Sequence, residues 1–367
     1  MKHSQTAIPC TLMRAGTSKG VFFSADDLPK NSGLREKVLL AVMGSPDVRQ
    51  IDGLGGADPL TSKVAIVSRS SKPGIDVDYL FAQVSIDKPI VDMTPNCGNI
   101  LAGVGSFAIE RGLVMPTAPK TTVTIHMVNT GNIAVAHIPT PNGTINFEGD
   151  TAIAGVPKTA AAIQIDFQDT AGSVCDSLLP TGNVLDDIDG CKATLIDNGM
   201  PVVVLRAMDF GKSGYESPAE LDNDKNFKSR LEQVRIIAGN RMGLGDVTSK
   251  VIPKMTLIAP PRHGGNISTR TFIPHKCHSA IGVLGAVTVA TVCVLPGSVT
   301  ENIAIIPDGA TKRLSVEHPT GEFTVEIEIS DEDSKFEIVR SSLVRTARTL
   351  FTGHTFVPKS VWDGNLR

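Results

Sequence analysis

Cys97 is the residue whose surroundings most suggest chemistry, because it lies where an apolar segment begins, in TPNCGNILAGVGSFAIERG (Thr94 to Gly112). Asn96, Gly98 and Asn99 flank the thiol with groups suited to polar contacts and a close backbone approach. Small apolar residues then predict a helix whose N–H groups and dipole favour an anion and a thiolate. The pattern predicts acid/base chemistry on an anion, and the alternative is a buried structural cysteine.

Two further segments offer polar groups and glycine-rich turns. RAGTSKG, residues 14–20, carries the cation of Arg14 and the hydroxyls of Thr17 and Ser18, without the GxxxxGK[ST] spacing of a phosphate loop. GLGGADPLTSK, residues 53–63, places Lys63 just before the apolar strand VAIV. A lysine there is usually solvated, but a partly buried one has a lowered pKa and can act as a general base.

Other kinds of site lack the pattern they require. GVGSFA, residues 103–108, matches GxGxxA but lies inside the predicted helix, so we predict no dinucleotide. His275, Cys277 and His278 have no second cluster to complete a metal site. A net charge of −3, the absence of a basic run and 4% aromatic residues argue against nucleic acid as a partner.

One uncharged stretch, Ser279 to Val299, has nearly the length of a membrane span. Pro296-Gly297 interrupts it, and its glycine, alanine and threonine content favours a buried helix, so we predict no membrane association.

The predicted location of the protein follows from the N-terminus and the cysteines. The N-terminus lacks the apolar region of a secretory signal. The six cysteines form no CxxC pair, which indicates reduced thiols and a cytoplasmic protein.

The elements that position these residues are mostly short strands. Strand patterns are VDYLFAQVSI, TTVTIHMV, NIAVAHI, ATLIDNGMPVVVL, KMTLIAP and EFTVEIEI. LREKVLLAVMG and NFKSRLEQVRIIAGNRMG predict amphipathic helices, whereas two small-residue helices start at Cys97 and near Cys277-His278-Ser279. These two starts lie about 180 positions apart, which suggests a duplicated α+β domain, each half a curved strand layer around a central helix. The join is expected near residue 187.

Several of these motifs together resemble the family of 2-methylaconitate cis–trans isomerases and 4-oxalomesaconate isomerases/tautomerases. They are MRAGTSKGVFF, IDGLGGADPLTSKVAIV, TPNCGNILAGVGSFAIERG and DNGMPVVVL. The resemblance covers nearly the whole chain and implies the fold of diaminopimelate epimerase, with two pseudo-symmetric halves. We assign these halves to residues 1–187 and 188–367, with the last strands allowed to return to the first. MGSPDVRQIDGLGGADPLTSK is similar to the 4-oxalomesaconate branch of bacterial gallate breakdown, and the methylaconitate branch is the near alternative.

The resemblance implies a cofactor-independent isomerase with Lys63 and Cys97 as its acid/base pair. Parent epimerases use two cysteines, one at each central helix; here the His278-Ser279-Ala280 region stands in the second place, and the role of Cys277 is open. The implied substrate is a small unsaturated tricarboxylate. No redox cofactor or metal is needed, and a homodimer is compatible with such folds. The implied substrate-binding residues are Arg14, Thr17, Ser18, Asn96, Gly98, Asn99, Ser279 and Ala280.

Three other classes compete with the isomerase. A binding protein that has lost catalysis would need neither Lys63 nor Cys97. A two-thiol epimerase would need a thiol at the second helix start, where only Cys277 is near. A membrane-associated protein would require the apolar stretch at Ser279 to Val299 to meet lipid.

Overall fold

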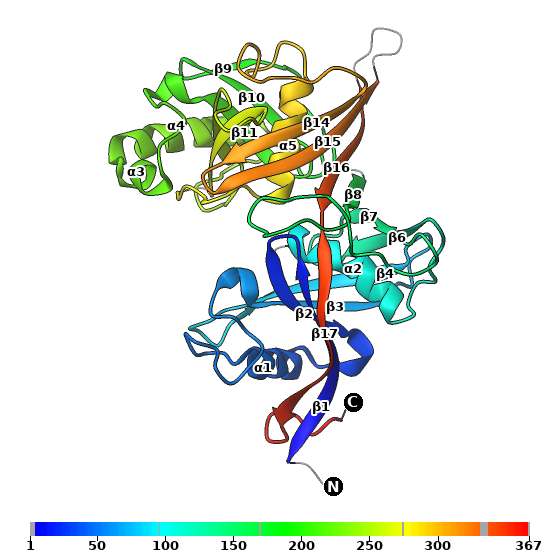
Figure 1. Ribbon diagram of the computed structural model, residues 1–367. Helices are drawn as coiled ribbons and strands as arrows, with labels where there is room; N and C mark the ends of the chain where they lie inside the picture. Colours follow the sequence, from blue (N-terminus) through cyan, green and yellow to red (C-terminus); the bar gives the residue numbers. More distant parts are fainter. Residues whose placement is uncertain (1–3, 95, 169, 274, 331–336, 366–367) are drawn as a thin grey trace. The chain divides into compact units, whose positions relative to one another are not determined.

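The computed structural model describes residues 4–94, 96–168, 170–273, 275–330 and 337–365 (Figure 1). The chain forms two compact units. Unit 1 comprises Met1–Ile165 and Arg345–Arg367, and unit 2 comprises Asp166–Val344. A division after residue 187 would cut strand β9 (Asp186–Ile188), which pairs with the next strand. The predicted boundary therefore differs from that of the compact units, and as the join of two duplicated halves it stays a prediction.

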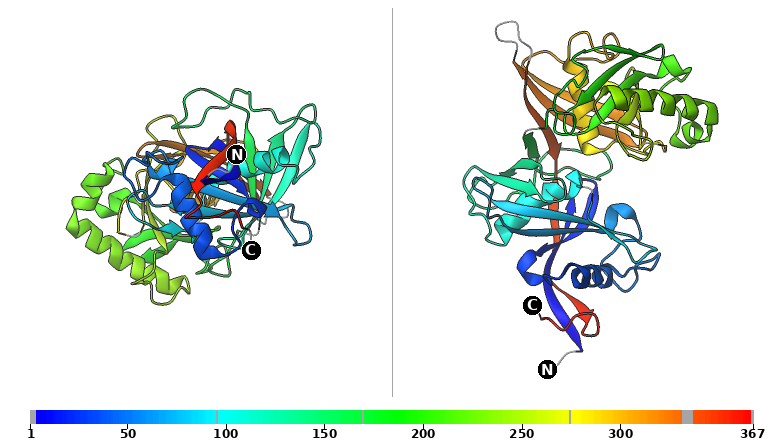
Figure 2. Two further views of the ribbon diagram at one scale, coloured as in Figure 1. Left: turned by 90° about the horizontal axis from the view of Figure 1, so that it is seen from below. Right: turned by 180° about the vertical axis from the view of Figure 1, so that it is seen from behind.

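Unit 1 is built on strands that begin and end the chain. β1 pairs antiparallel with β17 and β2, and Figure 2 shows β1 and β17 side by side. β2 runs parallel to β3, β3 pairs antiparallel with β4, β4 is parallel to β6, and β6 pairs antiparallel with β7. The strands are β1 (Gln5–Ala15), β2 (Ser18–Ser24), β3 (Lys63–Arg69), β4 (Val77–Val84), β5 (Val91–Asp92), β6 (Lys120–Met127), β7 (Ile133–Pro139) and β17 (Ala347–Pro358).

Two helices of unit 1 differ in how they are buried. α1 (Ser32–Met43) starts where the Asn31 side chain accepts from the Leu34 N–H at 2.9 Å. It ends at Gly44 with φ 75°, the last residue of the predicted helix LREKVLLAVMG. It buries one side only. α2 (Gly98–Glu110) is buried at every position from Ile100 to Ala108. A Cβ on Gly103 would lie 2.7 Å from the Phe22 ring, so the small residues of α2 permit close packing.

Unit 2 repeats the pairing pattern with other strands. β10 pairs antiparallel with β9 and β11, β11 is parallel to β12, β12 is antiparallel to β13, β13 is parallel to β14, and β14 is antiparallel to β15. β15 also pairs with β16. The strands not yet bounded are β8 (Ile163–Gln168), β10 (Cys191–Asp197), β11 (Pro201–Arg206), β12 (Lys254–Ala259), β13 (Ile267–Phe272), β14 (Thr311–His318), β15 (Gly321–Ser330) and β16 (Glu337–Arg345).

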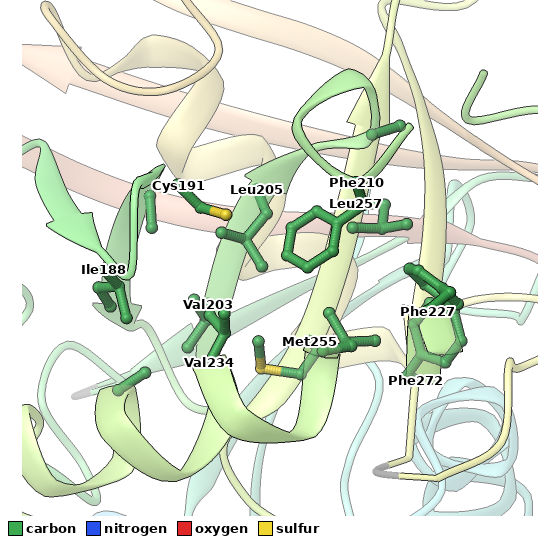
Figure 3. Close-up of a cluster of buried hydrophobic side chains, with 14 of the residues drawn as sticks. Ile188, Cys191, Val203, Leu205, Phe210, Phe227, Val234, Met255, Leu257 and Phe272 are labelled. Atoms are coloured by element: carbon green, nitrogen blue, oxygen red, sulfur yellow. The ribbon is translucent and has the colours of Figure 1, made fainter. Parts of the chain in front are cut away.

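The helices of unit 2 lie on both sides of its strands, with α3 and α4 on one side and α5 on the other. α4 (Lys225–Arg241), predicted as amphipathic, contributes to a hydrophobic cluster with β10, β11 and β12 (Figure 3). α3 (Pro218–Asn223) precedes it with a Ser217 capping box. α5 (Val283–Val294), which Figure 1 shows beside β14 and β15, is buried from Gly285 to Val294. In the part of the chain that the structure describes, no helix combines the length and hydropathy needed to cross a bilayer.

The two units share one order of elements, which confirms the predicted pair of similar halves around central helices. Each has an antiparallel strand pair, a helical connection to a parallel strand, a second antiparallel pair, a buried helix, and a further antiparallel pair. α2 and α5 occupy the same place in that order. The predicted start of the second helix was wrong, because α5 begins at Val283 and its N-cap is Gly282.

Candidate active site

Cys97 is the N-cap of α2, as its sequence context predicts. Its backbone is extended, with φ −129° and ψ 102°, and its carbonyl accepts the first helical hydrogen bond from Leu101 N at 2.9 Å. The thiol caps no N–H group, is half-buried and forms no disulfide. The first N–H groups of a helix have no partner inside the helix, so the thiol lies beside donors that can receive an anion.

Lys63 is the first residue of β3, and its side chain is 8% exposed. The ammonium donates to Oε1 of Gln83 at 2.5 Å and lies 5.2 Å from the centre of the Phe81 ring. Gln83 Nε2 in turn donates to the carbonyls of Ser62 at 2.8 Å and Pro59 at 3.1 Å. These two bonds fix the amide so that its oxygen faces the lysine. The sequence therefore placed Lys63 correctly at the start of a buried strand but did not indicate Gln83.

One face of β4 connects the lysine with the thiol. Tyr79, Phe81 and Gln83 occupy alternate positions of β4, so their side chains share one face of the sheet. Lys63, the cross-strand partner of Gln83, lies on the same face. The Tyr79 hydroxyl donates to the Cys97 carbonyl at 3.3 Å. Burial raises the pKa of Tyr79 well above its ordinary value, and the nearby Cys97 adds to that rise. The three β4 residues were missed, although their alternation in VDYLFAQV is a readable signal once β3 and β4 are known to pair.

The turn between β1 and β2 is joined to the start of α2. Asn99 Nδ2 donates to Thr17 Oγ1 at 3.0 Å, and the Thr17 N–H donates back to Asn99 Oδ1 at 3.4 Å. Gly16 has φ 52°, and a Cβ there would lie 2.2 Å from Asn99 Oδ1. Only glycine fits this close approach. The structure therefore brings Thr17 and Asn99 together with Cys97 in unit 1.

Ser18 and Asn96 carry polar atoms that lack partners. Ser18 is 1% exposed, and its hydroxyl has no hydrogen-bond partner among the described residues. Asn96 Nδ2 bonds Thr130 Oγ1, while its buried Oδ1 has no partner within the same described part of the chain. Gly98 is the first residue of α2 and half-buried. A buried polar group without a partner costs free energy, so both side chains are suited to a ligand.

Arg14 lies on the other face of its strand from Lys63, although its Nη1 donates to the carbonyl of Gly16 at 3.2 Å. Cys10, Leu12 and Arg14 occupy every second position of β1, so they share the face that packs against α1. Ala15 lies on the opposite face, which packs against α2. Arg14 Nη1 also donates to the Thr346 carbonyl at 2.5 Å and hydroxyl at 2.7 Å. Strand alternation thus turns Arg14 away from Lys63, and we leave it out of the candidate site.

The second helix start differs from the expectation for Ser279 and Ala280. Both precede the Gly282 N-cap, so neither N–H belongs to the first turn of α5. The Ala280 N–H donates to His278 Nδ1 at 2.8 Å and is therefore already used. Ser279 is exposed, and its carbonyl accepts from Thr320 Oγ1 at 2.9 Å. A contact of the Ser279 N–H with substrate stays a prediction.

Cys277 lies in the hydrophobic cluster shared with α4, on the opposite side of the strands from its neighbour His278. It is 8% exposed, and burial raises the pKa of its thiol to about 12, with Asp222 adding to the rise. A thiol in this environment stays protonated and inert. Among the residues that the structure describes, no three His, Cys, Asp or Glu side chains gather as metal ligands.

Known proteins similar to this chain are isomerases by name. The chain is 56% identical to (4E)-oxalomesaconate Delta-isomerase of Novosphingobium sp., with 95% of this chain and 97% of that protein covered. It is 55% identical to 4-oxalomesaconate tautomerase of Pseudomonas putida, with 98% and 99% covered.

Solved structures support the fold. A crystal structure of methylitaconate-delta-isomerase matches with a TM-score of 0.84 at 35% identity, covering 98% of this chain and 97% of that one. A hydroxyproline epimerase from Agrobacterium vitis matches with a TM-score of 0.53 at 10% identity, covering 96% and 93%, which shows the epimerase-like fold alone. The family described as "PrpF protein" matches residues 5–358. The chain therefore belongs to the PrpF protein family.

Proposed function

We propose that this protein is a cofactor-independent isomerase that tautomerises 4-oxalomesaconate, as in gallate degradation. The observation that carries the proposal is its 55–56% identity, over almost the whole chain, to two proteins named for that substrate. The unit 1 site supports it independently, because a lysine at the start of a strand and the cysteine at the N-cap of α2 lie on one side of the sheet.

The proposed reaction moves a proton and changes no oxidation state. A carbonyl and the conjugated double bond acidify a neighbouring C–H of the substrate, so a base can remove that proton to leave a delocalised enolate. Return of one proton at another atom completes the keto–enol or 1,3-allylic shift, and the product is an isomer of the substrate. One of Lys63 and Cys97 removes the proton and the other delivers a proton. General acid–base catalysis of this kind contributes about 10²- to 10⁴-fold to the rate.

The Gln83 contact gives the lysine a defined geometry. Its amide holds the Lys63 ammonium at 2.5 Å and is itself held by two backbone carbonyls. A group that is already oriented loses little entropy when the substrate arrives. The ring of Phe81 excludes water from one side of the ammonium, which strengthens its interaction with a developing enolate.

The start of α2 supplies the proposed contacts to substrate carboxylates. The N–H groups of Gly98 and Asn99 belong to the first turn, and the Ser18 hydroxyl is buried without a partner among described residues. The side-chain oxygen and nitrogen of an asparagine are told apart by their hydrogen-bond partners, and the two atoms can exchange places by a 180° turn of the amide. If the Asn96 amide is turned, Thr130 can donate to its oxygen and its NH₂ is left to donate to an anion.

The test is proton NMR in D₂O with the keto form of 4-oxalomesaconate and, in parallel, 2-methylaconitate. We expect enol formation and deuterium uptake with oxalomesaconate, and a loss of about 10²-fold or more in Lys63→Met and Cys97→Ala. Lys88→Met and Cys175→Ala remove a surface lysine and a half-buried cysteine elsewhere, and should retain the rate. Absence of exchange on both substrates would contradict the isomerase proposal.

A second candidate is an allylic isomerase of 2-methylaconitate or a related acid. It is favoured by the 35% identity and TM-score of 0.84 to the methylitaconate isomerase structure. The same lysine and thiol would serve it, because both reactions transfer a proton along an unsaturated acid. Turnover of 2-methylaconitate alone in the NMR experiment would select this function. The tricarboxylate character of the substrate, a homodimer and a cytoplasmic location stay predictions from the sequence.

A further inference from the structure

Unit 2 has a lysine at the strand position that Lys63 occupies in unit 1. Lys254 is the first residue of β12, as Lys63 is the first residue of β3, and each of these strands runs parallel to the preceding one. Met255, Leu257 and Phe272 point into the cluster with α4. Lys254 therefore lies on the other face of β12, the face that belongs to α5, just as Lys63 lies on the α2 face.

Lys254 is half-buried and carries no counter-charge. It forms no ion pair and no hydrogen bond through Nζ with any residue in the described ranges. Its pKa is lowered to about 8, chiefly by burial and further by the positive charge of Arg235. Retaining a partly desolvated cation without an acid beside it costs stability, and such groups are found more often at sites that bind a ligand.

His278 shares the face of Lys254. The Cys277–Phe272 bridge and the His278 N–H, which donates to the Thr271 carbonyl at 2.7 Å, place His278 beside Thr271. Thr271 pairs with Thr256, two residues from Lys254, and their hydroxyls lie 3.0 Å apart. The row Lys254, Thr256, Thr271 and His278 is thus on one face of unit 2.

The tautomer of His278 is set by its neighbour. Nδ1 accepts the Ala280 N–H at 2.8 Å, so in the neutral ring Nε2 carries the proton. Burial lowers the pKa of His278, and the charge of Lys254 lowers it further. The imidazole therefore presents an N–H donor on the same face as the lysine ammonium. Of the acids near this segment, Asp222 accepts from the Cys277 N–H and Glu232 binds Arg235, both on the α4 side.

We propose that Lys254 and the Nε2–H of His278 form a carboxylate-binding site in unit 2. Two donors, one of them charged, share a face, and neither forms an ion pair with an acid among the described residues. A carboxylate can accept from both. The class of ligand, a carboxylate of a small organic acid, rests on the proposed function. The site assigns a binding role to unit 2 through side chains other than the predicted Ser279 and Ala280.

The test measures binding of tricarballylate, a saturated tricarboxylate that cannot tautomerise, by calorimetry. We expect Lys254→Met to raise the Kd about 10- to 100-fold, since it removes a charged hydrogen bond. Lys254→Arg should restore most of the affinity. Lys276→Met removes an exposed lysine close to His278 and is the matched control, with a Kd change within about twofold.

A second readout follows the His278 ring by ¹H–¹⁵N NMR. Saturating tricarballylate should raise the pKa of His278 in the wild-type protein and leave it unchanged in Lys254→Met. If Lys254 had only a structural role, the ligand would change the pKa of His278 equally in both proteins. An unchanged Kd in folded Lys254→Met overturns the inference, even if deuterium exchange on oxalomesaconate is intact. Lysine-dependent binding without exchange on either substrate supports the site and rejects the proposed function instead.

Discussion

The two units use one arrangement of strands around a buried helix but equip the start of that helix differently. In unit 1 the N-cap is Cys97, whereas in unit 2 it is Gly282, which has no side chain to do chemistry. Both units begin the equivalent strand with a lysine. Lys63 donates to the Gln83 side chain, while on β13 the residue after the paired Phe272 is Ile273, whose side chain cannot accept a hydrogen bond. We infer that duplication produced two similar units, and that within the described residues the equivalent helix start and strand start carry a thiol and a lysine together in unit 1 and a lysine without a thiol in unit 2.

The largest expected effect concerns the thiols. Native iodoacetamide labelling at pH 7.5, followed by mass spectrometry, should modify Cys97 about 100-fold faster than Cys277. Cys97 is half-buried beside the first N–H groups of α2, whereas Cys277 is buried and its pKa is raised to about 12 by that burial. Cys175 is the matched control, because it is half-buried like Cys97 but its pKa is also raised to about 12. Equal labelling of Cys97 and Cys175 would show that exposure alone governs reactivity.

A glycine pair tests the packing of the two central helices. Gly103→Ala should lower the free energy of unfolding by about 1–3 kcal/mol, because its Cβ would lie 2.7 Å from Phe22. Gly285→Ala should be neutral or stabilise by up to about 1 kcal/mol, since the nearest atom is 3.7 Å away and alanine is the better helix former. Urea unfolding followed by circular dichroism measures both. Similar losses in the two variants would mean that α5 is packed as tightly as α2.

Gln83→Leu tests whether the lysine of unit 1 needs its acceptor. We expect kcat to fall about tenfold with KM changed little, because Lys63 loses the bond that orients it. The pH–rate profile should shift as well, which a mere packing defect would not cause. Asp92→Asn changes the exposed residue opposite Gln83 on β5 and should leave both parameters near wild type. An unaltered kcat and pH profile in Gln83→Leu would remove Gln83 as a positioning residue.

The smallest effect is a pH dependence of stability from Lys254. Its pKa in the folded protein is about 8, below the 10.5 of the unfolded chain, so between these values the unfolded state holds the extra proton. This group therefore destabilises the fold below pH 8, and stability rises as the pH increases from about 8 to 10.5. Denaturation at pH 7.5 and 9.5 should show that rise in the wild type, and less of it in Lys254→Met. A parallel pH response in the two proteins contradicts this assignment.

The sequence predicted elements better than the contacts between them. The two buried helices, both amphipathic helices and the listed strand patterns follow from local periodicity and composition, and all are present. Gln83, Tyr79 and Lys254 were missed because their importance comes from strand register, which brings together residues distant in sequence. Arg14 was expected in the site because the family resemblance implies it, whereas alternation along β1 places it on the α1 face. Its contact with substrate stays a prediction.

By itself the sequence determined that Cys97 would cap a buried helix and that Lys63 would open a buried strand, because helix starts and apolar runs are local signals. It also determined the duplicated architecture, through two small-residue helices half a chain apart. Only the tertiary structure decided that Gly282, and not His278 or Ser279, caps α5. The reason is that Cys277 and His278 pair with Phe272 and Thr271 of β13, and the Ala280 N–H is used by the His278 ring, so the helix begins only beyond these residues.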